Sequence, residues 1–98
     1  MPKVVFSNEF EGRKHYHFFC PACQNPHSFS VPSWTFNDDF EKPTIGGSIG
    51  VYKKDLSAFE CHSFVSDGKI TFCDDSTGHN VRGTVDLPEV PDIYLNAD

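Results

Sequence analysis

Two cysteines separated by two residues, Cys20 and Cys23, stand in the stretch HFFCPACQNPH. Pairs of this spacing occur in dithiol redox sites, in zinc sites and in disulfide frameworks. A redox pair places its first cysteine at the start of a helix, whose dipole lowers the thiol pKa. Here the second cysteine leads through a turn-like Gln-Asn-Pro into residues typical of a strand. The sequence therefore predicts a zinc knuckle at the turn of a hairpin.

A tetrahedral zinc ion needs two further sulfur or nitrogen ligands. The candidates are His27, Cys61, His62, Cys73 and His79. Cys61 and His62 are neighbours, and neighbours on a strand point to opposite faces, so we expect only one of them to bind. The preferred ligand set is Cys20, Cys23, Cys61 and His79, and the competing set is Cys20, Cys23, His62 and Cys73. His27 is a further candidate, either as a ligand or as a group beside the ligands.

An enzyme built on this metal would keep one position open for water and would place a general base nearby. Asp75 is the candidate base, with His62 as a second polar group beside it. The sequence contains no HExxH, and it lacks the H-x-E and PCxxC pair of the zinc deaminases. A binding protein with no catalytic residues is therefore the main expectation, and a zinc-dependent hydrolase is the alternative.

The elements that position these residues are short strands separated by Gly, Pro, Asn and Asp, and no segment keeps helical periodicity over three turns. We expect strands at residues 3–6, 14–19, 27–31, 34–36, 44–53, 61–66, 69–73 and 81–87. The expected fold is mostly β, a small antiparallel sheet or a partly open barrel or sandwich of hairpins that carries a zinc knuckle.

The clearest hairpin is CHSFVSDGKITFC, where an Asp-Gly pair at 67–68 is typical of a two-residue turn. This turn pairs Ser66 with Lys69 and therefore His62 with Cys73. Cross-strand partners share a face, so Cys61 and Cys73 point to opposite faces of the hairpin. The two ligand sets thus predict metal sites on opposite faces.

Length and charge limit the remaining choices. The 98 residues suit one domain, residues 1–98, which ends in a Pro-punctuated tail at 88–98. The formal charge of −6 disfavours binding to a phosphate backbone, so a protein is the expected partner rather than a nucleic acid. No signal peptide and no membrane-spanning segment is evident, which favours the cytoplasm, where cysteines bind metal more often than they form disulfides.

Four stretches, CPACQNPH, WTFNDDFEKPT, CHSFVSDGKITF and a closing GTVDLP, resemble a family of small proteins of tailed bacteriophages and prophages. The pattern of that family runs CPxCGxxH, WxFNGxxEKPT and CHSFVxDGxIxFxxDCTH. Its cysteine in DCTH is Ser76 here, which favours His79 as the ligand. Its glycine after the second cysteine is Gln24 here, which leaves Asn25 to form the turn.

The resemblance implies a phage origin and action in the cytoplasm of a bacterial host. Together with the acidic, aromatic-rich composition, it gives the expected function: a small zinc-stabilised protein that binds and inhibits a host protein or defence component. The alternatives are the zinc-dependent hydrolase, with Asp75 and His62 in the site, and an accessory protein of the virion or of DNA packaging.

Overall fold

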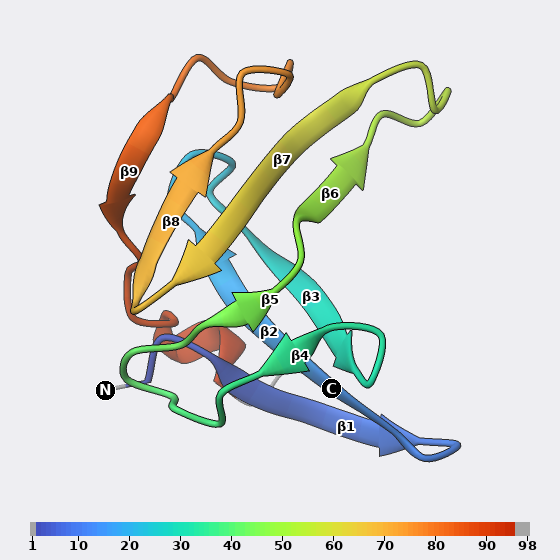
Figure 1. The fold of residues 1–98 in the computed structure, drawn as a ribbon, viewed down its shortest axis with the longest axis vertical. Helices are drawn as coiled ribbons and strands as arrows, with labels where there is room; N and C mark the ends of the chain where they lie inside the picture. The colour runs from blue at the N-terminus through green and yellow to red at the C-terminus, as the bar shows by residue number, and fades with distance from the viewer. Residues whose placement is uncertain (1, 96–98) are drawn as a thin grey trace.

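The computed structural model describes residues 2–95, and within them nine strands form three antiparallel sheets (Figure 1). The first sheet has the order β1 (Val5–Phe10), β2 (Arg13–Cys20) and β3 (Asn25–Val31). A small sheet pairs β4 (Thr35–Phe36) with β5 (Ile45–Gly46). The third sheet has the order β6 (Ile49–Tyr52), β7 (Phe59–Ser66), β8 (Lys69–Phe72) and β9 (Gly83–Asp86).

The expected mostly β, antiparallel fold is confirmed. One 3₁₀ turn, η1 (Asp92–Tyr94), is the only helical element in the described part of the chain. Across that same part, no helix has the length and apolar character to cross a membrane.

The register of the β7–β8 hairpin is the one that its Asp-Gly turn predicts. Ser66 pairs with Lys69, and the turn residues Asp67 and Gly68 both have positive φ. The N–H of Cys73 donates to the carbonyl of His62 at 2.9 Å, which continues the ladder beyond the end of β8. His62 therefore faces the same side of the sheet as Cys73, and Cys61 faces the other side.

The core lies between the first sheet and the third sheet. Its buried members from the first sheet and the segment before it are Val4, Tyr16, Phe18, Cys20 and Phe29; those from β5 onward are Ile45, Ile49, Cys61, Val65, Ile70, Phe72 and Leu87. Alternate residues of β7 point into this core, and the residues between them face outward. Two cysteines from different sheets thus lie in one buried cluster, with their sulfur atoms 4.0 Å apart.

The tail after β9 returns along the body. Val90 is buried, and its N–H donates to the carbonyl of Pro2 at 2.9 Å. The ring of Tyr94 stacks on Phe19 with centroids 5.8 Å apart. Residues 96–98 of the tail that the sequence predicts lie outside the described residues.

Candidate metal centre and histidine–aspartate pair

The β2–β3 turn presents the first two thiols as a knuckle. The N–H of Gln24 donates to the carbonyl of Cys20 at 2.9 Å, and the N–H of Cys23 approaches the sulfur of Cys20 at 3.4 Å. Gln24, rather than the expected Asn25, has the left-handed backbone, with φ of 57°. The Gln24 amide also donates to the carbonyl of Pro21, which offsets the strain of that conformation.

Four side chains bring one potential ligand atom each to a common point: Cys20, Cys23, His27 and Cys61. These atoms all lie within 4.8 Å of one another, and three of the four residues are buried. The Nε2 atom of His27 is buried and has no hydrogen-bond partner among residues 2–95. A buried imidazole nitrogen without a partner is costly, and a metal ion would satisfy it. The group can therefore hold a metal ion such as zinc.

The three thiols act as one unit. Hydrogen bonding to Cys61 is the largest cause that lowers the pKa of Cys20, to about 3, and the same contact raises the pKa of Cys61. The two sulfur atoms are 4.0 Å apart. Burial, and then the charge on Cys20, raises the pKa of Cys23 to about 11. One thiol of the group therefore loses its proton readily, and its negative charge opposes deprotonation of the other two. A divalent cation would offset the negative charge of all three thiolates.

His79 lies where the sequence expects it, beside Cys61, but it is not in the four-atom group. Its Nδ1 accepts a hydrogen bond from the N–H of Val81 at 3.2 Å, which leaves the proton on Nε2. That Nε2 lies 3.4 Å from the sulfur of Cys61 and points its proton toward it. The four-atom group therefore contains His27 where the sequence predicts His79. His79 instead donates a hydrogen bond to the sulfur of Cys61.

His62 and Cys73 of the competing ligand set lie on the other face of the third sheet. They form a separate group with Asp75, whose ligand atoms also lie within 4.8 Å of one another. The competing set would need Cys20 and Cys23 of the buried group and His62 and Cys73 of the outer group to bind the same ion. The third sheet lies between the two groups, so one ion cannot contact both. The free cysteines form no disulfide.

His62 and Asp75 form a close pair on this outer face. The Nδ1 atom of His62 is 2.9 Å from Oδ1 and 3.1 Å from Oδ2 of Asp75. An acceptor carboxylate holds the proton on Nδ1 and leaves Nε2 with a free lone pair. The His62 side chain is 18% exposed. A histidine oriented in this way can act as a general base.

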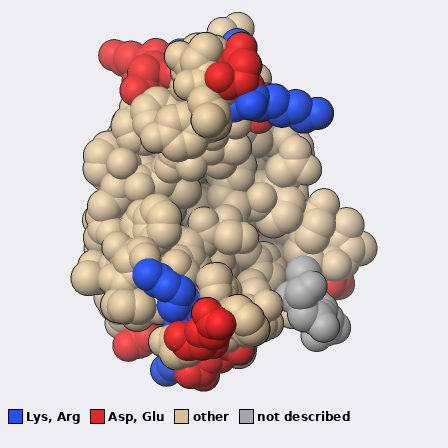
Figure 2. Space-filling model, turned by 90° about the vertical axis from the view of Figure 1, so that its right-hand side faces the viewer, with Lys and Arg blue, Asp and Glu red and all other residues tan. Residues whose placement is uncertain are grey.

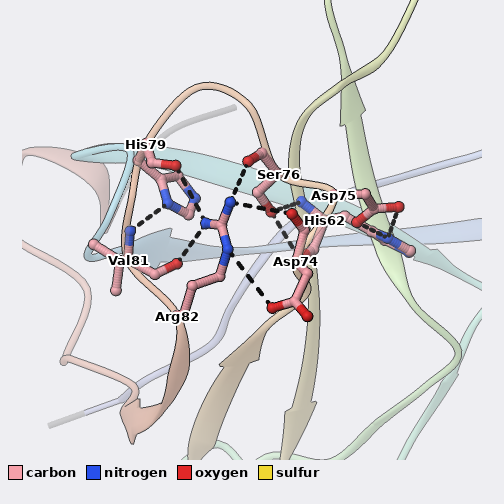
Figure 3. A network of polar contacts seen from close by, with 7 residues as sticks. All are labelled: His62, Asp74, Asp75, Ser76, His79, Val81 and Arg82. Carbon is pink, nitrogen blue, oxygen red and sulfur yellow. Dashed lines mark hydrogen bonds and ion pairs between the residues drawn. The ribbon is translucent and has the colours of Figure 1, made fainter.

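Hydrogen bonds hold the loop after β8 in a position that places Asp75 next to His62 (Figure 3). The hydroxyl of Ser76 accepts from the N–H of His62 at 2.9 Å and donates to its carbonyl at 3.1 Å. Arg82 donates to the carbonyls of Ser76 at 2.7 Å and of Asp74 at 3.1 Å. Because Asp75 lies between the two carbonyls that Arg82 holds, its backbone is fixed on both sides.

The ring of Phe59 packs against the imidazole ring of His62. The two rings stack with centroids 4.2 Å apart and an interplanar angle of 13°. A Cβ atom at Gly50, directly across from His62, would overlap the Phe59 ring. Gly50 therefore has a specific steric role, because it leaves the space that this ring fills.

Ser48 directly precedes β6. The register of β6 and β7 pairs Ile49 with Ser63 and Gly50 with His62, so continuing that register by one residue would place Ser48 opposite Phe64 and diagonal to His62. Diagonal neighbours on one face are about 7–8 Å apart at the backbone, which is within reach of an imidazole. Gly47, with φ of 103°, turns the chain just before it, and the indole of Trp34 donates to the Ser48 carbonyl at 3.0 Å.

A second serine–histidine contact lies in the first sheet. The Ser7 hydroxyl is 2.6 Å from Nδ1 of His17, and Nε2 of His17 donates to the carbonyl of Tyr94 at 2.7 Å. Both residues line a cavity of about 470 Å³. The orienting group is a neutral carbonyl instead of a carboxylate, so this contact would stabilise an imidazolium less well than His62–Asp75 does.

The sequence alone does not single out Ser48, Ser7 or His17. The glycines at 46, 47 and 50 indicate a bulge or a close approach by another backbone, and strand alternation predicts an ordinary strand position for His17. A GGS at the entry to a strand can also present a serine on a tight turn. The relation of Ser48 to His62 depends on the pairing of β6 with β7, which a single sequence does not display.

Comparison with known proteins gives one match. A family model described as "Bacterial ubiquitination-like system serine protease (BubE)" matches residues 1–73. No curated protein and no solved structure matches the chain. The matched segment contains Ser48, His62 and the four residues of the metal group, and it ends two residues before Asp75.

This match corrects three expectations. The resemblance to a phage and prophage family is wrong, because the matching family is that of a bacterial system. The expected inhibitor of a host protein is wrong for the same reason, and so is the preference for a binding protein over an enzyme, since the family is described as a serine protease. The family description agrees better with the hydrolase alternative than with the expected inhibitor.

Proposed function

The chain belongs to the BubE family of bacterial ubiquitination-like system serine proteases, and on that premise we propose that it is a zinc-stabilised serine protease. His62 is its general base, Asp75 orients His62, and Ser48 is its nucleophile. The single observation that carries the proposal is the contact of Nδ1 of His62 with the Asp75 carboxylate at 2.9 Å.

The pair supports this role because it matches the chemistry that a serine protease needs. A carboxylate on Nδ1 keeps the correct tautomer and stabilises the imidazolium that forms when Nε2 takes the proton of the serine. The stacked ring of Phe59 limits the rotation of His62, so the lone pair on Nε2 keeps one direction. A fixed base loses little entropy on reaching the transition state.

Ser48 is the best nucleophile among the serines around His62. Ser63 points into the core, and the Ser76 hydroxyl is occupied by both backbone groups of His62. Cys73 is a poor alternative, because burial, with the charges of Asp75 and Asp74, raises the pKa of its thiol. Ser48 is half-buried and follows Gly47, whose φ is positive, and a continued β6–β7 register would place it on the same face as His62.

The metal in this proposal is zinc, with a structural role. Three thiols and one imidazole make a complete tetrahedral set and leave no position for water, which is the pattern of structural sites. A chain of this length buries a small core, and a metal that ties the β2–β3 turn to β7 adds stability that the core alone lacks. The catalytic group is therefore the serine rather than the metal.

The face beside β6 suits a peptide substrate. In Figure 2, which views the side where β6 forms the sheet edge in Figure 1, charged side chains gather at the two ends and the surface between them carries almost none. Separately, a row of ring contacts runs from Tyr52 of β6 through Phe59 and His62 to Phe64 of β7. We propose that the substrate is an uncharged, extended segment of a protein of the ubiquitination-like system.

The test is covalent labelling with an alkyl fluorophosphonate, which phosphonylates activated serines. The wild-type protein should be labelled at one site, and mass spectrometry of the peptides should locate the adduct on Ser48. Ser48→Ala and His62→Ala should abolish labelling.

The second serine–histidine contact supplies the matched control. Ser7→Ala removes the hydroxyl next to His17 and should leave labelling unchanged. An adduct on Ser7, or labelling that survives Ser48→Ala and disappears with Ser7→Ala, would refute the assignment of the nucleophile.

A further inference from the structure

We propose that His62, Cys73 and Asp75 form a second, weaker site for a zinc-like divalent cation, and that occupation of this site switches the His62–Asp75 pair off. The metal-binding part stands on the geometry of the outer face alone, whereas the inhibition rests on the proposed function. This cation is distinct from the one held by the buried thiols, because the two groups lie on opposite faces of the third sheet.

The geometry brings three kinds of donor together from two segments. Ligand atoms of an imidazole, a thiol and a carboxylate lie within 4.8 Å of one another. Cys73 is held opposite His62 by the hydrogen bond from its N–H to the His62 carbonyl, 2.9 Å long. Asp75 is held from both sides by the contacts of Arg82. The site is thus pre-formed, so little entropy is lost when a cation binds.

The donors and their surroundings suit a borderline-soft divalent cation. A thiolate and an imidazole select zinc over magnesium or calcium, which prefer oxygen ligands. Burial, followed by the charges of Asp75 and Asp74, raises the pKa of the Cys73 thiol, and those two charges would also attract a cation placed beside it. Binding releases that one proton to solvent, and no oxidation or reduction takes place.

The three ligands differ from the buried group in number and exposure. Zinc with three protein ligands keeps a position for water, and the exposed Asp75 side chain, 55% accessible, remains in exchange with solvent. Four mostly buried donors hold the first cation. The second cation should therefore bind more weakly and be exchangeable under conditions that leave the first one in place.

A cation on His62 removes the base whichever ring nitrogen it takes. On Nε2 it occupies the lone pair that must accept the serine proton. On Nδ1 it displaces the proton that is shared with Asp75. The neutral ring then carries its proton on Nε2, so Nε2 no longer has a lone pair that could accept the serine proton. Inhibition therefore follows from the ligand set without any movement of the backbone.

The test compares the wild-type protein with Cys73→Ala, using zinc as the probe, native mass spectrometry for stoichiometry and fluorophosphonate labelling for reactivity. We expect the wild type to bind a second zinc ion and Cys73→Ala to bind only the first. Zinc should slow labelling of the wild type. The concentration for half-inhibition should rise at least about tenfold in Cys73→Ala, since even loss of an outer-shell partner costs 10–100-fold in metal affinity.

The matched control is Asp74→Asn, which changes the neighbouring carboxylate outside the three-atom group and should keep the second zinc. The first zinc, retained in Cys73→Ala, reports that this variant is folded. Equal zinc binding in wild type and Cys73→Ala would refute the second site. Labelling that rises with zinc would refute inhibition, and a wild type that is never labelled but binds two zinc ions would refute the proposed function while leaving the site intact.

Discussion

Cys61 and His62 are consecutive residues of β7 whose side chains belong to two different centres on opposite faces of one sheet. The sulfur of Cys61 lies 4.0 Å from that of Cys20 in the core, whereas Nδ1 of His62 lies 2.9 Å from Asp75 on the outer face. The alternation of a strand produces this arrangement. One peptide bond therefore joins the candidate metal centre to the His62–Asp75 pair.

Metal removal should lower stability and, through β7, reactivity. Chelation or Cys20→Ser should lower the apparent melting temperature by more than about 10 °C, because the metal supplies folding free energy to a small domain. Labelling of Ser48 should fall in parallel in Cys20→Ser, which loses the buried metal and leaves the outer group of His62, Cys73 and Asp75 intact. Differential scanning fluorimetry with and without a chelator measures the first effect. Cys73→Ala changes a cysteine outside the buried group and is the control: a chelator should lower its melting temperature as much as that of the wild type. If a chelator left the melting temperature of the wild type unchanged, the structural role of the metal would be wrong.

Asp75 should matter far more than the carboxylate beside it. Asp75→Asn keeps the shape of the side chain but no longer fixes the His62 tautomer, so the rate of labelling should fall by about 10³–10⁴-fold. Asp74→Asn removes a charge one residue away and a weak ion pair with Arg82, and should change the rate little. Time courses of labelling with the fluorophosphonate compare the rates of the two variants. Equal rates in both would mean that the carboxylate does not orient the base.

Gly50 should tolerate no side chain. Gly50→Ala forces Phe59 away from His62, which should cost about 1–3 kcal/mol of unfolding free energy. Misplacement of the base should slow labelling by about 10²-fold. The double variant Gly50→Ala, Phe59→Ala removes the overlap and should be no slower than Phe59→Ala alone. A Gly50→Ala protein with wild-type rate and stability would show that the ring does not position His62.

Ser63 offers a contrast to Ser48 on the same pair of strands. Its hydroxyl is buried on the core face and has no hydrogen-bond partner within residues 2–95. Ser63→Ala should therefore raise the free energy of unfolding by about 1 kcal/mol, because a buried polar group without a partner is costly. Labelling should stay as in the wild type. Chemical denaturation measures the change, and a destabilised variant would indicate a partner for this hydroxyl.

The parts of the fold that depend on local sequence were predictable. The Asp67-Gly68 turn gives the register that pairs Ser66 with Lys69, and the Cys20–Cys23 spacing predicts a knuckle at a hairpin turn. Both features depend on residues close together in the chain. The separation of Cys61 from Cys73 onto two faces then follows from strand alternation alone.

The choice between His27 and His79 was not predictable, because both lie near Cys61 and differ only in hydrogen bonding. The N–H of Val81 fixes the tautomer of His79, while Nε2 of His27 is left without a partner. Ser48 was not among the predicted site residues, because its significance depends on how β6 pairs with β7, and the glycines around it indicate only a bulge or a close approach by another backbone. The expected phage inhibitor depended on a family resemblance, which the match to residues 1–73 replaced.

The bond from the Trp34 indole to the Ser48 carbonyl joins two parts of the fold. Trp34 follows β3 of the first sheet, whereas Ser48 leads directly into β6 of the third, so one hydrogen bond links the two sheets at the residue that we propose as the nucleophile. If that proposal holds, a change in how the two sheets pack would bear directly on the position of Ser48.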